Sequence, residues 1–204
     1  PAILDTLPFK LDSASSDHAS FSADFILKNY SATDFQVRLE RKIHLLSGLE
    51  IDKLLGNKLN DSIHSVAYKS DNTIINMGPN SWNRQTGMLS VWMLSMFTPS
   101  PSVVIFIPYK EGDEKELGKI VSDDYFGKVP ADRLKEDKGI IYFKADGKYR
   151  SKIGISPNRT LGWAASYDAA SKALTLLYCE FPKGRTDYVN SNGKFKGSIF
   201  GRCC

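Results

Sequence analysis

Apolar and polar residues alternate with a period of two near the start of the chain. Most odd-numbered side chains are apolar in residues 21–28, and the pattern resumes in residues 35–45 after a polar turn at 29–34. Such alternation is typical of strands with one buried and one solvated face. Helical periodicity is confined to a short segment at 49–55 that Gly56 ends. The pattern therefore predicts an all-β protein that begins with two antiparallel strands.

Later segments carry further strand signals. Residues 86–97 and 102–109 are apolar on both faces, which predicts strands covered on both sides. Asp146-Gly147 favours a type I′ turn between strands at 140–145 and 148–155. Two more strand pairs are expected, at 63–68 and 73–77 around Asp71-Asn72 and at 161–167 and 173–181. Roughly ten strands with turns at regular intervals favour an antiparallel β-sandwich or supersandwich.

The other segments are expected to be irregular. Residues 1–18 form an entry segment, and residues 111–136 form a long polar connection with one helical turn at 130–134. Neither an internal repeat nor a Pro/Gly linker divides the sequence. We therefore expect a single β-sandwich domain over residues 1–191, followed by an atypical tail at 192–204.

Charge and cysteine content narrow the possible partners. The 27 basic residues are interleaved with 23 acidic ones, for a net charge of +4, so nothing favours a nucleic-acid partner. No apolar run approaches the about 18 residues of a membrane-spanning helix. Cys179 lies in an apolar run, and Cys203 and Cys204 are adjacent without a zinc-binding spacing. We expect no metal and no cofactor.

Two residues in a loop are candidates for ligand binding. Trp82 and Arg84 follow Pro79 in a segment rich in asparagine and serine. Loops carry function more often than core strands do, and an aromatic ring with hydrogen-bonding neighbours fits a polar, ring-shaped ligand. We predict that Trp82 stacks on such a ligand, with Arg84 close to it.

Four other basic residues are also candidates. Arg41 interrupts the alternation of its strand, either as a strand-end or internally paired residue or because it faces a ligand. In the hairpin predicted around Asp146-Gly147, Lys148, Arg150 and Lys152 form one cationic row. This row is either a solvated face or a surface for a hydroxyl-rich or acidic sugar.

Catalytic candidates are few. General acid–base chemistry would have to come from His44, His64, Glu111 or Glu180, and no nucleophile motif accompanies them. The acidic loop at 113–124 does not have the spacing of a calcium-binding loop. The sequence contains neither a glycine-rich nucleotide-binding motif nor a P-loop.

Several longer strings resemble an uncharacterised bacterial family with a galactose-mutarotase-like fold, the β-supersandwich of the aldose epimerases. The resemblance covers about residues 19–191. It rests on the strings at 78–82, 86–92, 98–102, 124–134, 146–154 and 186–191. It implies a carbohydrate ligand and a periplasmic or extracellular location.

The C-terminal end departs from that family. The family continues past residue 191 with a tryptophan-containing strand, whereas residues 192–204 of this chain look truncated or replaced. The glutamate that acts as base in mutarotases would belong to the missing part, and their histidine motifs are not recognisable. An incomplete sheet would have open edges and would favour self-association.

These observations favour a carbohydrate-binding or carbohydrate-processing protein. One alternative is an enzyme of the aldose 1-epimerase type. The other is a noncatalytic structural or interaction module, which would expose an apolar patch.

Overall fold

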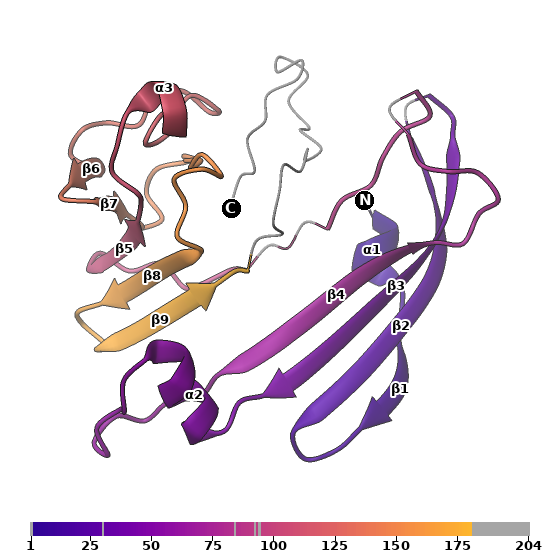
Figure 1. Cartoon of the computed structure of the whole chain (residues 1–204), viewed down its shortest axis with the longest axis horizontal. Coiled ribbons are helices and arrows are strands. Elements are labelled where there is room, and N and C mark those ends of the chain that lie inside the picture. The colour runs from indigo at the N-terminus through magenta and orange to yellow at the C-terminus, as the bar shows by residue number, and fades with distance from the viewer. Residues whose placement is uncertain (1, 30, 84, 92, 94, 181–204) are drawn as a thin grey trace. The chain divides into compact units, whose positions relative to one another are not determined.

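The computed structural model of the chain describes residues 2–29, 31–83, 85–91, 93 and 95–180 (Figure 1). The chain divides into two compact units, Pro1–Trp92 and Met93–Cys204, called unit 1 and unit 2 below. Each contains an antiparallel sheet, which confirms the prediction of an all-β protein. A stacked supersandwich and a single domain over 1–191 stay predictions. The tail at 192–204, with Cys203 and Cys204, lies outside the described residues.

Unit 1 is built on a four-stranded sheet in the order β1-β2-β3-β4. Its elements are α1 Ala2–Thr6, β1 Lys10–Ala14, β2 His18–Lys28, β3 Asp34–Leu45, α2 Gly48–Leu55 and β4 Tyr68–Asn76. β2 and β3 pair along their length, from His18 opposite His44 to Lys28 opposite Asp34. The two strands predicted from the alternation are therefore confirmed, whereas α1 and β1 replace the expected irregular entry segment.

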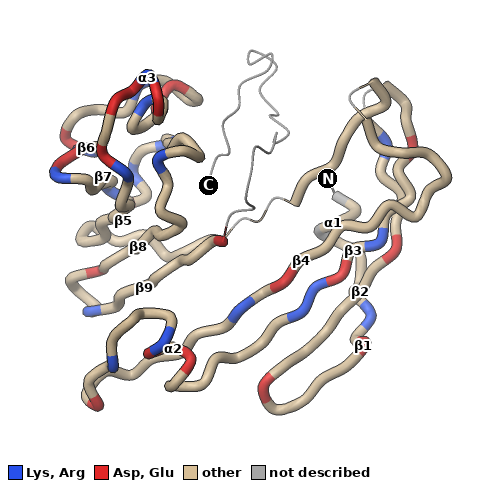
Figure 2. The backbone as a smooth tube through the Cα atoms, viewed as in Figure 1, with Lys and Arg blue, Asp and Glu red and all other residues tan. Residues whose placement is uncertain are grey.

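The two faces of this sheet differ as the alternation requires. Ala23, Phe25, Phe35 and Val37 are buried on one face and form the core of unit 1. Most of the alternate positions are polar or charged, with Asp24 opposite Arg38 and Ser22 opposite Glu40, and Figure 2 shows acidic and basic residues along β2, β3 and β4. Partly buried residues complete the core: Leu4, Leu7, Phe9, Leu27, Leu39, Ile74, Trp82 and Leu89.

The helical segment predicted at 49–55 is α2. Ser47 accepts a hydrogen bond from the backbone of Glu50, whose carboxylate accepts one from the backbone of Ser47, so a capping box begins the helix. Gly56 ends it in the left-handed conformation, with a φ of 66°, as the sequence predicted.

The strand predicted at 73–77 is part of β4, whereas the turn predicted at Asp71-Asn72 and the strand predicted at 63–68 are wrong. One continuous strand, β4, runs through both residues, and Asp71 lies opposite Lys42 while Asn72 lies opposite Arg41. The local turn preference of Asp and Asn is overridden here because β3 provides a long partner edge for hydrogen bonding.

Unit 2 contains a five-stranded sheet in the order β6-β7-β5-β8-β9. Its elements are β5 Val103–Pro108, α3 Glu114–Leu117, β6 Leu134–Asp137, β7 Ile140–Lys144, β8 Trp163–Asp168 and β9 Ala173–Tyr178. Buried Tyr109, Ile141 and Ile155 form the centre of its core. The strand predicted at 102–109 and the last predicted pair, at 161–167 and 173–181, are confirmed as β5, β8 and β9.

The hairpin predicted around Asp146-Gly147 is wrong. β7 ends at Lys144 and pairs with β5 and β6, and residues 148–155 contain only an isolated bridge at Gly154. The tight hairpin lies one strand earlier, between β6 and β7. Its turn residues, Lys138 and Gly139, have φ values of 47° and 75°, which are the positive values of a type I′ turn.

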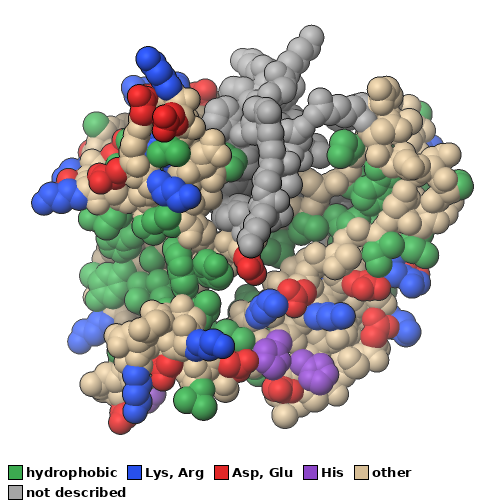
Figure 3. Space-filling view, in the orientation of Figure 1, with side chains coloured by type: hydrophobic (Ala, Val, Ile, Leu, Met, Phe, Trp, Pro, Cys, Tyr) green, Lys and Arg blue, Asp and Glu red, His purple; other side chains and the backbone are tan. Residues whose placement is uncertain are grey.

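The run at 86–97 was expected to form a buried strand, and its described residues contain none. Met96 is 85% exposed and Phe97 is 58% exposed. At the start of the run, Gly87 pairs with Asn83 instead of with a neighbouring strand. Unit 2 also exposes Leu174, Leu176 and Leu177 of β9, and Figure 3 shows hydrophobic side chains gathered over β8 and β9.

Candidate functional site

A groove of about 510 Å³ lies in unit 1 beside Trp82. It is formed where β3 begins, where β4 ends and by the loop that follows β4. Trp82 and Phe35 are its aromatic residues. Amide and hydroxyl side chains provide most of the rest, from Gln36, Asn76, Asn80, Ser81, Asn83 and Thr86. An aromatic surface with a few placed hydrogen-bonding groups is typical of a site for a small polar ligand.

Trp82 has a fixed support. Its ring meets the ring of Phe35 edge to face, with centroids 6.1 Å apart and planes at 74°. Phe35 is only 4% exposed, because it belongs to the core of the sheet, whereas Trp82 is half-buried. The core therefore holds one side of the indole while part of the ring stays accessible to a ligand.

Asn76, the last residue of β4, shapes the first half of the loop. Its Oδ1 accepts a hydrogen bond from the backbone N–H of Gly78 at 3.0 Å, and its Nδ2 donates to the carbonyl of Asn80 at 2.8 Å. The backbone N–H of Met77 donates to the carbonyl of Gln36 at 2.9 Å. The two Asn76 bonds fix the shape of the loop, and the Met77 bond ties its start to β3.

Asn83 shapes the second half of the loop. Its Oδ1 accepts from the backbone N–H groups of Gln85 and Thr86, each at 2.9 Å, and its backbone pairs with Gly87. Asn29, from the turn between β2 and β3, donates to the carbonyl of Thr86 at 2.8 Å. Side-chain-to-backbone bonds of this kind fix irregular loops, so Trp82 projects from an ordered segment.

Polar side chains of the groove are available to a ligand. Within the described residues, Gln36, Asn80 and Ser81 have no side-chain hydrogen-bond partner, and all three are exposed. A carboxamide both donates and accepts, as does a hydroxyl. Asp34, the one titratable residue in the described lining, forms a 3.4 Å ion pair with Lys28.

The other unit 1 candidates for ligand binding are not brought into this groove. Arg84 lies outside the described residues. Arg41 lies on β3 opposite Phe21 and Asn72, and it is exposed. Because Arg41 is exposed to solvent, its charge does not need the buried partner that its position in the alternation suggested.

The predicted cationic row belongs to unit 2, and it does not lie on a strand. Lys148, Arg150 and Lys152 lie in an irregular segment after the Asp146-Gly147 bend. Arg150 lies over the ring of Phe126 and Lys152 over the ring of Tyr125. The structure therefore brings two members of the row to one pair of rings.

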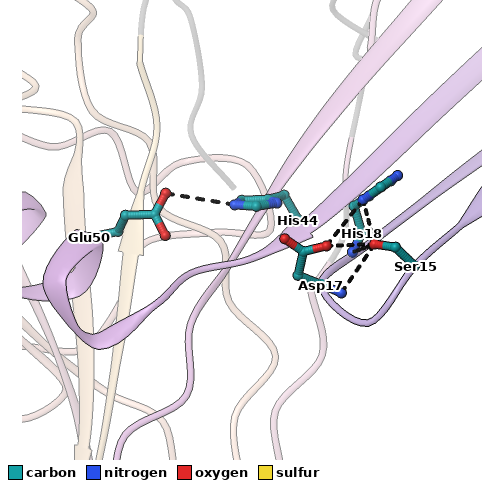
Figure 4. A network of polar contacts seen from close by, with 5 residues as sticks. All are labelled: Ser15, Asp17, His18, His44 and Glu50. Atoms are coloured by element: carbon teal, nitrogen blue, oxygen red, sulfur yellow. Dashed lines mark hydrogen bonds and ion pairs between the residues drawn. The ribbon is translucent and has the colours of Figure 1, made fainter.

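The four acid–base candidates do not form a site together. His64, Glu111 and Glu180 are exposed in irregular segments, and none of them lines the groove. His44 lies on β3, with its Nε2 3.7 Å from Oε1 of Glu50 (Figure 4). The pKa of the Glu50 carboxyl is lowered first by the Ser47 hydroxyl and the Ser47 backbone, and then by His44.

A serine, a histidine and an aspartate also meet in the turn between β1 and β2 (Figure 4). Ser15 Oγ lies 2.6 Å from Nδ1 of His18, and Asp17 Oδ1 lies 3.2 Å from the same nitrogen. A catalytic triad needs the serine and the carboxylate on opposite ring nitrogens. This cluster therefore caps an exposed turn and does not have the geometry of an activated nucleophile.

Sequence reasoning missed the interactions that organise unit 2. Arg133 and Asp146 form a buried bidentate pair, with side chains 10% and 5% exposed. The hydrogen bond from Arg133 and the backbone N–H of Lys148 hold the pKa of the Asp146 carboxyl well below its usual range. Asp146 belongs to this pair instead of to a two-residue hairpin, so a turn signal concealed a long-range partner.

Arg159 was missed as well. It is 1% exposed, and its guanidinium donates to the carbonyls of Gly118, Lys110 and Gly112 at 2.6, 2.9 and 3.1 Å. Three carbonyls satisfy the buried cation without a carboxylate and fix the loop from 110 to 118. In the sequence, Ser-Pro-Asn-Arg-Thr resembles a surface turn and carries no sign of burial.

Two absences apply to the described part of the chain. No group of three or more His, Cys, Asp and Glu side chains there is arranged to hold a metal ion. None of the helices there is long and apolar enough to cross a membrane.

The chain belongs to DUF6786, a family of unknown function that matches residues 1–201. The comparisons with curated proteins and with solved structures find no match. Membership of an uncharacterised family is thus confirmed, over a longer range than the predicted 19–191, while the galactose-mutarotase-like fold stays a prediction.

Proposed function

We propose that the groove beside Trp82 binds a carbohydrate. The observation that carries the proposal is the combination of an indole held against the core by Phe35 with amide and hydroxyl side chains that have no described partner. A sugar ring has an apolar C–H face and a rim of hydroxyl groups. Trp82 contacts the first, and Gln36, Asn80 and Ser81 exchange hydrogen bonds with the second.

The composition of the groove favours binding over epimerisation. Proton transfer at an anomeric centre needs an acid and a base within hydrogen-bonding reach of the substrate. Asp34 is the single titratable residue of the described lining, and it is paired with Lys28. The proposal is therefore a binding protein, with the exported location that the resemblance implies. Equilibration of α- and β-anomers faster than in buffer alone would contradict the noncatalytic assignment.

The test is a glycan-array screen of the full chain, followed by calorimetry on the sugars that bind. Trp82→Ala should weaken binding about 30-fold, corresponding to a loss of about 2 kcal/mol, because an aromatic anchor is removed. Tyr68→Ala is the matched control, since Tyr68 is a 62% exposed aromatic residue of β4 outside the groove. It should bind as the parent chain does.

Trp82 also packs on the core, so its removal could disturb the fold. Gln36→Ala and Asn80→Ala remove exposed side chains and should leave the melting temperature unchanged while weakening binding about fivefold each. Unchanged affinity in all three groove variants would place the sugar elsewhere, and a blank array with a folded protein would refute the proposed function.

A second candidate function is a noncatalytic interaction module whose partner is a second copy of the chain. The supporting observation is β9, a terminal strand of its sheet in which Leu174, Leu176 and Leu177 are 59%, 43% and 41% exposed. Unprotected apolar edge strands pair with other chains. Light scattering should then show a dimer that Leu176→Lys dissociates, and a constant monomeric mass across concentrations would exclude this function.

A further inference from the structure

Cations are stacked on aromatic rings at one place in unit 2. The Arg150 guanidinium carbon lies 4.3 Å from the ring centre of Phe126, and Lys152 Nζ lies 4.4 Å from that of Tyr125. The two rings touch edge to face, with centroids 4.7 Å apart. Contact between the rings brings the two cations to one surface, which we call the cation–ring surface.

The cation–ring surface is built on fixed backbone. Ser122 and Gly154, which flank the ring loop and the cationic segment, exchange two backbone hydrogen bonds of 2.8 Å. On the other side of the rings, Val129 is 4% exposed, and its N–H donates to Asp123 at 3.1 Å. Ile153, directly after Lys152, packs against the core. The rings and the cations are thus attached to the same rigid part of unit 2.

Arg150 and Lys152 carry charges that no acidic residue in the described part of unit 2 neutralises. Within the described residues neither side chain forms an ion pair or a hydrogen bond. Arg133 provides the contrast, because it also lies over a ring, that of Tyr149 at 5.4 Å, but is bound to Asp146. Arg133 is therefore bound in a structural ion pair, whereas Arg150 has no ion-pair partner among the residues that the structure describes.

Stacking orients a cation without using its hydrogen-bond donors. The N–H groups of a guanidinium lie in its plane and point outward from its edge, so a ring against its face leaves them free. The ring also restricts the motion of the side chain, so less conformational entropy is lost when an anion binds. Arg150 and Lys152 are therefore preorganised donors for an anion.

The surroundings indicate which anion fits. The cationic segment at 147–154 contains three basic and no acidic residues, and on the ring side Asp123 and Asp124 precede Tyr125. Phe126 and Tyr149 are 47% and 43% exposed and offer apolar surface beside the charges. A carboxylate attached to a sugar ring combines the negative charge with a C–H face for such a surface.

A nucleic acid fits less well. Single-stranded nucleic acids bind by stacking bases on aromatic faces, and here Arg150 and Lys152 already cover faces of both rings. A sugar acid places its carboxylate on the cations and its C–H face on the uncovered parts of the rings, so it needs no open ring face for stacking.

We propose that the cation–ring surface of unit 2 binds an acidic carbohydrate of the uronic acid class. Arg150 donates two parallel hydrogen bonds to a carboxylate of the sugar, and Lys152 binds the same carboxylate or that of the next sugar residue. This site is independent of the proposed groove at Trp82 and can be tested apart from it.

The test is calorimetric titration of the full chain with oligogalacturonate at low and at moderate salt. The same oligomer with methyl-esterified carboxyl groups is the matched ligand control. Arg150→Gln and Lys152→Gln should each weaken oligogalacturonate binding about tenfold, because a charge-assisted hydrogen bond is lost. Lys135→Gln on exposed β6 removes the same charge elsewhere in unit 2, and it should leave the affinity for oligogalacturonate nearly unchanged. Trp82→Ala should bind oligogalacturonate unchanged, even if it abolishes binding of a neutral sugar.

Four outcomes would overturn the proposal. Oligogalacturonate that does not bind, or an esterified form that binds equally well, removes the role of the carboxylate. Unchanged binding in folded Arg150→Gln and Lys152→Gln proteins removes the site. Equal affinity for polyphosphate or for a single-stranded oligonucleotide, lost in the same variants, would make the surface a general polyanion site.

Discussion

At the scale of single residues, the groove depends on a glycine that no motif signals. Gly87 ends the Asn83 turn with a φ of 114°, in the region that favours glycine. A Cβ at this position would lie 2.7 Å from Nδ2 of Asn29 and 2.9 Å from Cζ of Phe35. Phe35 is a core residue that supports Trp82, so the ring has little room to move away.

Gly87→Ala is therefore expected to destabilise the fold and to weaken sugar binding at the groove. Strain at a positive φ costs about 1–3 kcal/mol, and the clash with Phe35 adds to it. Gly127→Ala is the control, because Gly127 has a similar φ of 105° with nothing within 4 Å of its added Cβ. Urea unfolding measures both variants. Equal losses of stability would show that the close approach to Asn29 and Phe35 contributes nothing.

At the scale of secondary structure, the apolar–polar alternation of the sequence correctly predicted the strands β2 and β3. Both strands follow the period of two, because successive side chains of a strand point to opposite faces of the sheet, so the local sequence decides which residues are buried. The failures occur where a distant partner decides. Asp146 binds Arg133 and does not form the predicted two-residue turn. Asp71 and Asn72 pair with β3 and belong to the continuous strand β4. At the candidate site, Trp82 was predictable from its loop, whereas its support by Phe35 comes from tertiary packing.

The turn between β6 and β7 gives a prediction at the same scale. Lys138 has a φ of 47°, which Asn adopts more readily than Lys does, and Asn-Gly is the preferred type I′ pair. Lys138→Asn should raise the free energy of unfolding by about 0.5 kcal/mol. Lys135→Asn, within β6, is the control and should lower it, since Asn is depleted in strands. Thermal unfolding distinguishes the two, and a loss of stability in Lys138→Asn would contradict the assigned turn.

At the scale of the whole molecule, the carboxyl groups of the two units give them different stabilities at low pH. In unit 2, Asp168 accepts hydrogen bonds from the hydroxyls of Ser102, Ser171 and Ser100, which lower its pKa to about 2, and the pKa of Asp146 is lowered further. In unit 1, the carboxyls with lowered pKa values belong to more exposed pairs, such as Asp24 with Arg38. Water and salt screen such pairs, so they contribute little.

The folded-state pKa values of Asp168 and Asp146 are below the value of 3.8 that an unfolded aspartate has. The unfolded chain therefore takes up protons first as the pH falls. The stabilisation by these two groups is complete above about pH 5 and is lost progressively as the pH falls towards and below 2. Unit 2 should consequently lose more hydrogen-exchange protection than unit 1 between pH 4 and pH 2.

Asp168→Asn separates this effect from general acid sensitivity. Asn keeps the shape and accepts hydrogen bonds but does not titrate, so the variant should be less stable at pH 7 and should lose less stability between pH 4 and pH 2. Asp34→Asn is the control, because Asp34 is exposed and pairs with Lys28 in unit 1. Urea unfolding across this pH range gives the slopes. A slope for Asp168→Asn as steep as that of the parent chain would mean that the serine hydroxyls do not hold this carboxylate in its charged form.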